Sequence, residues 1–123
     1  ELAAAYLGDR DALELVRRDD LVRRIADGDV IVVDVRPHLE YAAGHIAGAV
    51  SIPIERLARQ VRNLPADVDV VAYCRGPFCV FADDAVRLLR KRGRRARRLE
   101  DGFPEWRNAS LPVQTAPIPE RTS

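Results

Sequence analysis

The segment DVDVVAYCRGPFCVFADDAVRLLRKRG (residues 67–93) contains both cysteines of the chain and changes its pattern between them. Its first part, residues 67–74, is rich in β-branched residues and predicts a strand that is buried on both faces of a sheet. Its last part, residues 80–92, has apolar residues at helical spacing and ends at Gly93. Cys74 therefore follows a strand directly, and a short bend leads from it into a helix.

The rest of the chain alternates short strand patterns with short helix patterns. Further strands are predicted at residues 15–16, 29–36, 48–53 and 95–100, and further helices at 19–27, 37–44, 54–64 and 102–109. Asp19 and Asp20 are candidates to cap the first of these helices. Alternation without an Asn-Gly hairpin turn predicts an α/β fold, with an open parallel five-stranded sheet and helices on both faces. Ligands of such sheets bind at the carboxyl ends of the strands.

The size and charge of the chain exclude several classes of protein. With 123 residues and a mass of 13.8 kDa, it is the size of one domain with one core. Its apolar runs are much shorter than the roughly 18 residues of a membrane span, and its net charge of +1 indicates no particular partner. The basic run at residues 90–98 is interpreted as a solvated helix end and an alternating strand, not as a nucleic-acid contact. The given residues contain no basic-then-apolar signal pattern, and because the sequence starts at Glu1 we expect it to be a fragment of a cytoplasmic protein.

The two cysteines are too few for a disulfide scaffold, so they are candidates for a reactive site. If Cys74 follows a central strand, amides of the bend and of the first helical turn point towards its sulfur. That helix terminus and Arg75 both favour the thiolate. Gly76 permits a tight bend, whereas Pro77 offers no N–H. The alternative is that both cysteines are small apolar residues buried at a turn.

Three segments, in this order, resemble the rhodanese homology domain: DVRPHLEYAAGHIAGAVSIP, VVAYCRGPFCVFADDAVRLLRKRG and RRLEDGFPEWRNASLPV. The first contains the signature of an aromatic residue followed by His-hydrophobic-Pro-Gly-Ala, with Ala47 in place of the usual proline. The last contains the Gly-aromatic and Trp pattern of the family. The CRGPFC loop, together with YLGDRDALELV upstream, is most similar to bacterial rhodanese domains that follow an ArsR-type winged-helix DNA-binding domain.

The resemblance divides the chain into three parts. Residues 1–13 are expected to be the end of an upstream helix and a linker, residues 14–113 the rhodanese-like domain, and residues 114–123 a C-terminal tail. The expected partner in the full-length chain is an upstream DNA-binding domain. This fragment itself is not expected to bind nucleic acid or a membrane.

Sulfur transfer is the activity that the resemblance implies. The Cys74 thiolate would attack the outer sulfur of thiosulfate or of a persulfide, and a thiol or cyanide would accept the sulfur from the resulting Cys74 persulfide. Arg75 is the candidate for holding an anionic donor. The backbone amides of Gly76, Phe78, Cys79 and Val80 are the candidates for an anion-binding cradle.

Cys79 departs from ordinary rhodanese loops, which lack a second cysteine at this position. One interpretation is that it attacks a Cys74 persulfide, releasing sulfide and leaving a disulfide between the two residues. The other is that Cys79 only packs in the first turn of the helix. The sequence leaves both interpretations open.

Phosphatase and zinc chemistry fit the sequence less well. A phosphatase of the tyrosine or dual-specificity type has an arginine after five intervening residues, where this chain has Val80. Cys74, Cys79, His38 and His45 lack the closed spacing of a zinc site, so a metal is not expected. The sulfur transfer that the resemblance implies needs no organic cofactor, and none is expected. His45 is interpreted as a turn-forming residue.

Asp34 and Arg36 are the expected supporting residues beside the loop, with Arg36 pairing with Glu40. Phe103 and Trp106 are expected to belong to the core. Two alternatives to a sulfurtransferase enzyme remain. One is a module that senses persulfide or oxidised sulfur and reports it to the upstream domain, and the other is an inactive interaction domain.

Overall fold

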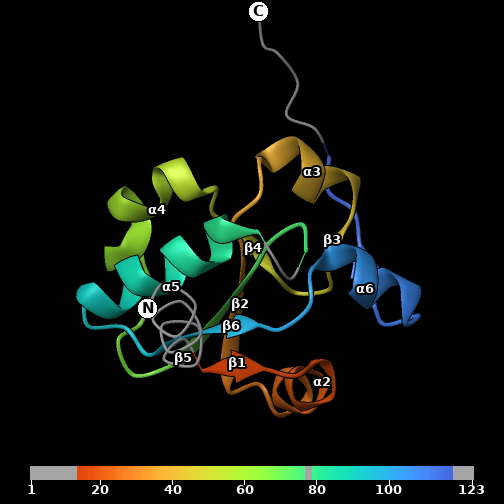
Figure 1. The fold of residues 1–123 in the computed structure, drawn as a ribbon, viewed down its shortest axis with the longest axis horizontal. Helices are drawn as coiled ribbons and strands as arrows, with labels where there is room; N and C mark the ends of the chain where they lie inside the picture. Colours follow the sequence, from red (N-terminus) through yellow and green to blue (C-terminus); the bar gives the residue numbers. More distant parts are fainter. Residues whose placement is uncertain (1–13, 77–78, 118–123) are drawn as a thin grey trace, which may run out of the picture.

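A parallel sheet forms the centre of the molecule (Figure 1). The computed structural model describes residues 14–76 and 79–117. The strands lie in the order β1-β6-β5-β2-β4, and all of their pairings are parallel. Their bounds are β1 (Leu15–Val16), β2 (Val30–Asp34), β4 (Val50–Ser51), β5 (Asp69–Tyr73) and β6 (Ala96–Leu99). The five-stranded sheet predicted from the sequence is confirmed.

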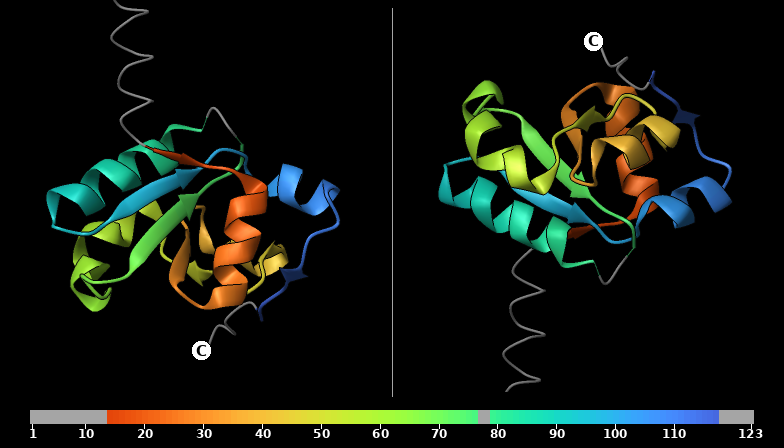
Figure 2. Two further views of the ribbon diagram at one scale, coloured as in Figure 1. Left: turned by 90° about the horizontal axis from the view of Figure 1, so that it is seen from below. Right: turned by 90° about the horizontal axis from the view of Figure 1, so that it is seen from above.

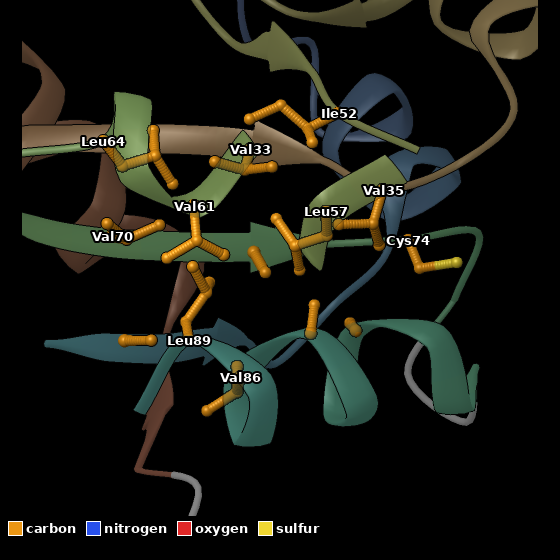
Figure 3. Close-up of a cluster of buried hydrophobic side chains, with 14 residues drawn as sticks. Val33, Val35, Ile52, Leu57, Val61, Leu64, Val70, Cys74, Val86 and Leu89 are labelled. Carbon is orange, nitrogen blue, oxygen red and sulfur yellow. The ribbon is translucent and has the colours of Figure 1, made fainter. Parts of the chain in front are cut away.

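Helices cover both faces of this sheet, as expected (Figure 2). One face packs against α4 (Ile54–Gln60), the 3-10 turn η1 (Val61–Asn63) and α5 (Val80–Lys91), and the other against α2 (Arg18–Asp27) and α6 (Phe103–Asn108). A further short helix is α3 (His38–Ala43). Figure 3 shows the first of the two apolar clusters, in which Cys74 and Val35 lie at one end and Val70 and Leu89 lie towards the other. No helix in the described part of the chain has the length and hydrophobicity to span a membrane.

A second, antiparallel ribbon was not predicted. It pairs β3 (His45–Ile46) with β7 (Val113–Gln114). Gln114 had been assigned to the C-terminal tail, and the tail continues past it with an Ala116 amide that donates to the Ala42 carbonyl at 3.0 Å. Strands of two residues are too short to show a period of two, so this pairing leaves no sequence pattern.

The start of α2 also differs from the expectation. Asp19 and Asp20 lie within the first turn and do not cap it, because the helix begins one residue earlier, after Arg17. In the first turn their carboxylates still interact favourably with the helix dipole. The predicted end is confirmed, since Gly28 adopts the left-handed conformation with φ of 72° and closes the helix.

Candidate active site around Cys74 and Cys79

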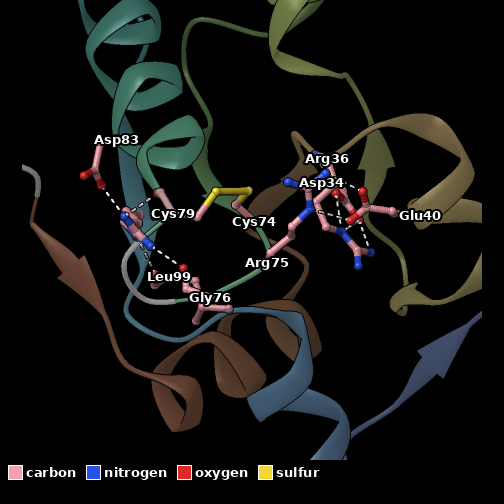
Figure 4. Close-up of a disulfide and its surroundings, with 10 residues drawn as sticks. Asp34, Arg36, Glu40, Cys74, Arg75, Gly76, Cys79, Asp83 and Leu99 are labelled. Atoms are coloured by element: carbon pink, nitrogen blue, oxygen red, sulfur yellow. Dashed lines mark hydrogen bonds and ion pairs between the residues drawn. A yellow bond between two sulfur atoms is a disulfide. The ribbon is translucent and has the colours of Figure 1, made fainter.

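Cys74 follows the last residue of β5 directly, so it lies at the carboxyl end of the central strand. Its side chain is fully buried and belongs to the apolar cluster beneath α4 and α5. Cys79 is half-buried and is the residue that precedes the first turn of α5. The two residues form a disulfide, with their Cα atoms 6.2 Å apart (Figure 4). The chain thus places both sulfurs at the N-terminus of a 12-residue helix.

A backbone hydrogen bond joins the described residues on either side of the bend between the cysteines. The Cys79 amide donates to the Gly76 carbonyl at 3.2 Å. We had expected this amide to face an anionic donor, and the structure gives it an acceptor within the loop. Val80 is the first residue of α5, where amides lack intrahelical acceptors. Phe78, another predicted cradle residue, lies outside the described residues.

The expected pair between Arg36 and Glu40 is wrong. Glu40 of α3 accepts hydrogen bonds from Arg75, at 2.8 Å from Nε to Oε1 and 2.5 Å from Nη2 to Oε2. These hydrogen bonds, together with the positive charge of Arg75, hold the pKa of Glu40 below its usual value. Both side chains contact solvent, so the pair is weak by the standards of buried pairs. The guanidinium predicted to bind an anionic donor therefore already binds a carboxylate.

Arg36 instead pairs with Asp34, at the carboxyl end of β2. Its Nη2 lies 2.7 Å from Asp34 Oδ2 and also donates to the Gly44 carbonyl at 2.6 Å. The Tyr73 hydroxyl donates to the same carboxylate at 2.6 Å and accepts from the Ile46 amide. Burial, followed by the charge of Asp34, raises the pKa of Tyr73, so this hydroxyl stays protonated. The network fixes the ends of β2 and β5 beside Cys74.

A second buried ion pair lies on the other side of the cysteines, and sequence reasoning missed it. Arg98 of β6 pairs with Asp83 of α5, and both side chains are almost completely buried. The same guanidinium donates to the carbonyls of Gly76 at 2.7 Å and Cys79 at 3.0 Å. One signal was present: Arg98 lies two residues after the buried Ala96, on the face of the strand that the period of two assigns to the core.

Gly102 is the other residue that sequence reasoning missed. A Cβ atom at this position would lie 2.3 Å from both the Cα and the N of Gly76. The chain after β6 therefore passes against the backbone of the loop, where there is space for glycine alone. The next amide, that of Phe103, donates to the Cys74 carbonyl at 3.0 Å. Phe103 and Trp106 are buried in the second apolar cluster, which confirms their place in the core.

Both histidines make hydrogen-bond contacts near the site. His45 is buried, with Nδ1 2.8 Å from the Tyr41 carbonyl and its ring stacked on Tyr41, in agreement with a turn-forming role. Nδ1 of His38 lies 3.0 Å from Ser51 Oγ. Across residues 14–76 and 79–117, no three His, Cys, Asp or Glu residues are grouped so that they could hold a metal ion. The described residues bring two sulfur atoms and several hydrogen-bond donors together at this site.

The chain is similar to a protein family and to a transcriptional regulator. A family model described as Rhodanese-like domain matches residues 17–109. The HTH-type transcriptional regulator Rv0324 of Mycobacterium tuberculosis is 52% identical over 117 residues, which are 94% of this chain and 51% of the regulator. The chain spans about half the length of that relative.

Two more distant similarities, one to a sequence and one to a solved structure, extend over most of the length of the matched protein. A protein named Sulfurtransferase, from Allochromatium vinosum, is 32% identical over 96 residues, covering 77% of this chain and 89% of the relative. The crystal structure of the BH2092 protein from Bacillus halodurans superimposes with a TM-score of 0.79 at 29% identity, covering 94% of this chain and 87% of that chain.

Proposed function

Since this chain belongs to the rhodanese-like domain family, we propose that it transfers sulfane sulfur through a persulfide on Cys74. The observation that carries the proposal is the position of Cys74, at the end of β5 and at the N-terminus of α5, with Cys79 in disulfide contact. A helix N-terminus lowers the pKa of a cysteine thiol and increases the thiolate fraction at neutral pH. The reduced Cys74 is then an activated nucleophile.

The first step loads sulfur onto Cys74. The thiolate attacks the outer sulfur of thiosulfate, a bond forms between the two sulfurs, and sulfite leaves with the electron pair of the broken S–S bond. With an organic persulfide as donor, the same attack releases a thiolate. A thiol or cyanide then takes the outer sulfur and restores the Cys74 thiolate.

The second step is open to Cys79 as well as to an external thiol. The Cys79 thiolate attacks Cys74 Sγ, the bond from Cys74 to the outer sulfur breaks, and hydrosulfide leaves. The disulfide that results is the bond present in this structure, with a Cα separation of 6.2 Å that is ordinary for disulfides. Reduction by two equivalents of thiol returns the loop to its starting state.

The pair between Arg75 and Glu40 influences the choice of donor. Thiosulfate is a dianion, and to bind the Nε–Nη2 edge of the Arg75 guanidinium it must displace the Glu40 carboxylate. The sulfur group of an organic persulfide carries at most one negative charge, so it depends less on this guanidinium. We therefore propose that persulfides are better donors than thiosulfate for this domain.

A second candidate function is a sensor of persulfide or oxidised sulfur. Two observations favour it: the disulfide itself, which is a durable record of oxidation, and the 52% identity to a protein named as a transcriptional regulator. In this proposal, residues 1–13 lead back to a DNA-binding domain, and the state of the cysteines alters its affinity for DNA. Slow turnover with a long-lived disulfide distinguishes the sensor from an enzyme, which turns over repeatedly.

Intact-mass spectrometry of the reduced protein tests both candidates. The protein is treated with thiosulfate or with glutathione persulfide, beside Cys74→Ala and Cys79→Ala variants. We expect a gain of one sulfur atom that requires Cys74. If Cys79 resolves the persulfide, the wild type shows a transient gain followed by a loss of two hydrogens, and Cys79→Ala keeps the sulfur. A wild-type protein that gains no sulfur from either donor contradicts the proposal.

A further inference from the structure

Arg98 binds both ends of the loop that separates the two cysteines. Its Nη2 donates to the Gly76 carbonyl at 2.7 Å, and its Nη1 donates to the Cys79 carbonyl at 3.0 Å. The third nitrogen of the guanidinium, Nε, also has an acceptor, because it donates to the carbonyl of Leu99 at 3.3 Å. Every contact is made by a side chain that is about 1% exposed, so water competes little for these carbonyls.

Asp83 keeps this guanidinium in place. The Asp83 carboxylate accepts from Arg98 Nη1 and is itself nearly buried on the first turn of α5. An unpaired buried charge is strongly unfavourable, so each of the two side chains fixes the other. The pair therefore connects β6 with α5 at the point where the loop enters the helix, and Figure 4 shows Asp83 on the side of the cysteines opposite Glu40.

The strand also fixes where the guanidinium lies. Arg98 of β6 pairs with Ala72 of β5, and Ala72 lies two residues before Cys74. Because a trans peptide points its C=O and N–H in opposite directions, turning the Cys79 carbonyl to Arg98 turns the Val80 amide away from it. Arg98 thus adds a side-chain restraint on the peptide that begins α5.

We propose that Arg98, held by Asp83, is a positioning residue that keeps Cys79 within bonding distance of Cys74. The inference deepens the proposed function, because it concerns the same two sulfurs, but it can fail or hold independently of sulfur transfer. The guanidinium touches no reacting atom. It acts by fixing the two carbonyls between which the loop must bend.

The disulfide equilibrium measures this role without any sulfur donor. Two protein thiols and oxidised dithiothreitol exchange with the protein disulfide and reduced dithiothreitol, with two electrons and two protons transferred. If Arg98 holds the sulfurs together, its removal lowers the effective concentration of one thiol for the other. We expect the equilibrium to shift about tenfold towards the dithiol, equivalent to about 30 mV for a two-electron couple.

Three variants make the test specific. Arg98→Met combined with Asp83→Leu removes the ion pair and the hydrogen bonds to both carbonyls without leaving a buried charge. Proteins often tolerate the replacement of a buried ion pair by apolar residues. Arg98→Lys keeps the charge opposite Asp83, but an ammonium cannot reproduce the planar fork that reaches both carbonyls. Arg97→Met is the matched control, because Arg97 is the neighbouring residue of β6 and pairs with Glu14 at 2.9 Å on the other face.

The results separate a positioning role from a general loss of stability. We expect a shift of about tenfold in the double variant, a smaller shift in Arg98→Lys and the wild-type equilibrium in Arg97→Met, with folding checked by circular dichroism. Should the double variant not fold, Arg98→Lys decides the question. A wild-type equilibrium in a folded Arg98 variant, or an equal shift in Arg97→Met, overturns the proposal. Failure of the sulfur-loading experiment alone contradicts the proposed function and leaves this inference intact.

Discussion

At the carboxyl end of the sheet, the arginines that bind an aspartate and backbone carbonyls are buried, whereas at the amino end of β5 the arginines around Asp69 are partly or largely exposed. Arg36 and Arg98 each combine one buried aspartate with one or more main-chain oxygens. Asp69, the first residue of β5, is surrounded by Arg24 at 2.6 Å, Arg95 at 2.8 Å and Arg97 at 3.8 Å.

The buried and the exposed arginines differ in whether they restrain the backbone. A buried guanidinium that binds a carbonyl restrains the backbone, because both groups would be costly to leave unpaired. The arginines around Asp69 are partly or largely exposed, and exposed pairs contribute about 1 kcal/mol or less. The reactive loop is thus built at the end where charges order the main chain, and substitutions at the two ends should have different effects.

The largest expected effect is on stability, from breaking the buried pair beside Cys74. Asp34→Ala leaves Arg36 buried without its carboxylate and removes the acceptor of the Tyr73 hydroxyl, so we expect a loss of about 3–5 kcal/mol in the free energy of unfolding. Asp69→Ala, its counterpart at the other end, should cost about 1 kcal/mol or less. Urea denaturation measures the free energy of unfolding of both variants. Equal losses in the two variants would contradict the proposed difference between the two ends of the sheet.

The second-largest effect is expected from replacing a glycine by alanine at each end of the sheet. In Gly102→Ala, the new Cβ meets the Gly76 backbone at 2.3 Å, and we expect a loss of about 1–3 kcal/mol with at least about tenfold slower sulfur loading of Cys74. Gly28→Ala forces alanine to a φ of 72° and should cost about 1–2 kcal/mol. Its loading rate should stay that of the wild type. Slower loading in both variants would mean that stability alone controls the loop.

A smaller effect is expected on the choice of donor. Glu40→Gln releases Arg75, so kcat/KM for thiosulfate should rise about two- to fivefold, as expected from loss of an exposed pair, while kcat/KM for an alkyl persulfide, whose sulfur group carries at most one negative charge, should rise less. Glu14→Gln breaks a similarly exposed pair with Arg97 and is the control for nonspecific charge effects. A fall in kcat/KM for thiosulfate would show that Glu40 assists the donor.

The smallest effect is in the dependence of stability on pH. The hydrogen bond from Arg24 is the main cause that holds the pKa of Asp69 below its usual value. A depressed folded-state pKa means that the contribution of ionised Asp69 is complete above its unfolded pKa of about 4 and is lost as the pH falls through the folded pKa. The urea midpoint of Asp69→Asn should therefore fall less steeply below about pH 4 than that of the wild type. Identical slopes would contradict this assignment.

The sequence predicted much of the fold because its signals are local. The β-branched run that ends at Asp34, the run before Cys74 and the turn at Gly28 each depend on neighbouring residues, and the structure confirms them. The pairs around the site are different. Asp34 and Arg36 are two residues apart, yet the sequence could not show that Arg36 pairs with Asp34 and not with Glu40. The distance from Arg36 to Glu40 depends on the position of α3.

The sequence could place Arg98 on the core face of its strand, but it could not show that Arg98 pairs with Asp83 or that Gly102 contacts Gly76. Each contact joins segments that meet only after β6 has paired with β5 and α5 has packed on the sheet. In a single sequence, Arg98 is one arginine in a basic run, and its burial follows from the face of the strand on which it lies. The contact of Gly102 arises because two turns at the same end of the sheet approach each other.

Taken alone, the amino-acid sequence determined the alternation of strands and helices and the place of Cys74 between a strand and a helix, because backbone preferences and apolar periodicity act over a few residues. The tertiary structure decided which charges are buried, which arginine meets which carboxylate, and that Cys79 lies against Cys74. The physical reason is that burial and pairing depend on distances between segments, and the packing of the sheet with its helices sets these distances.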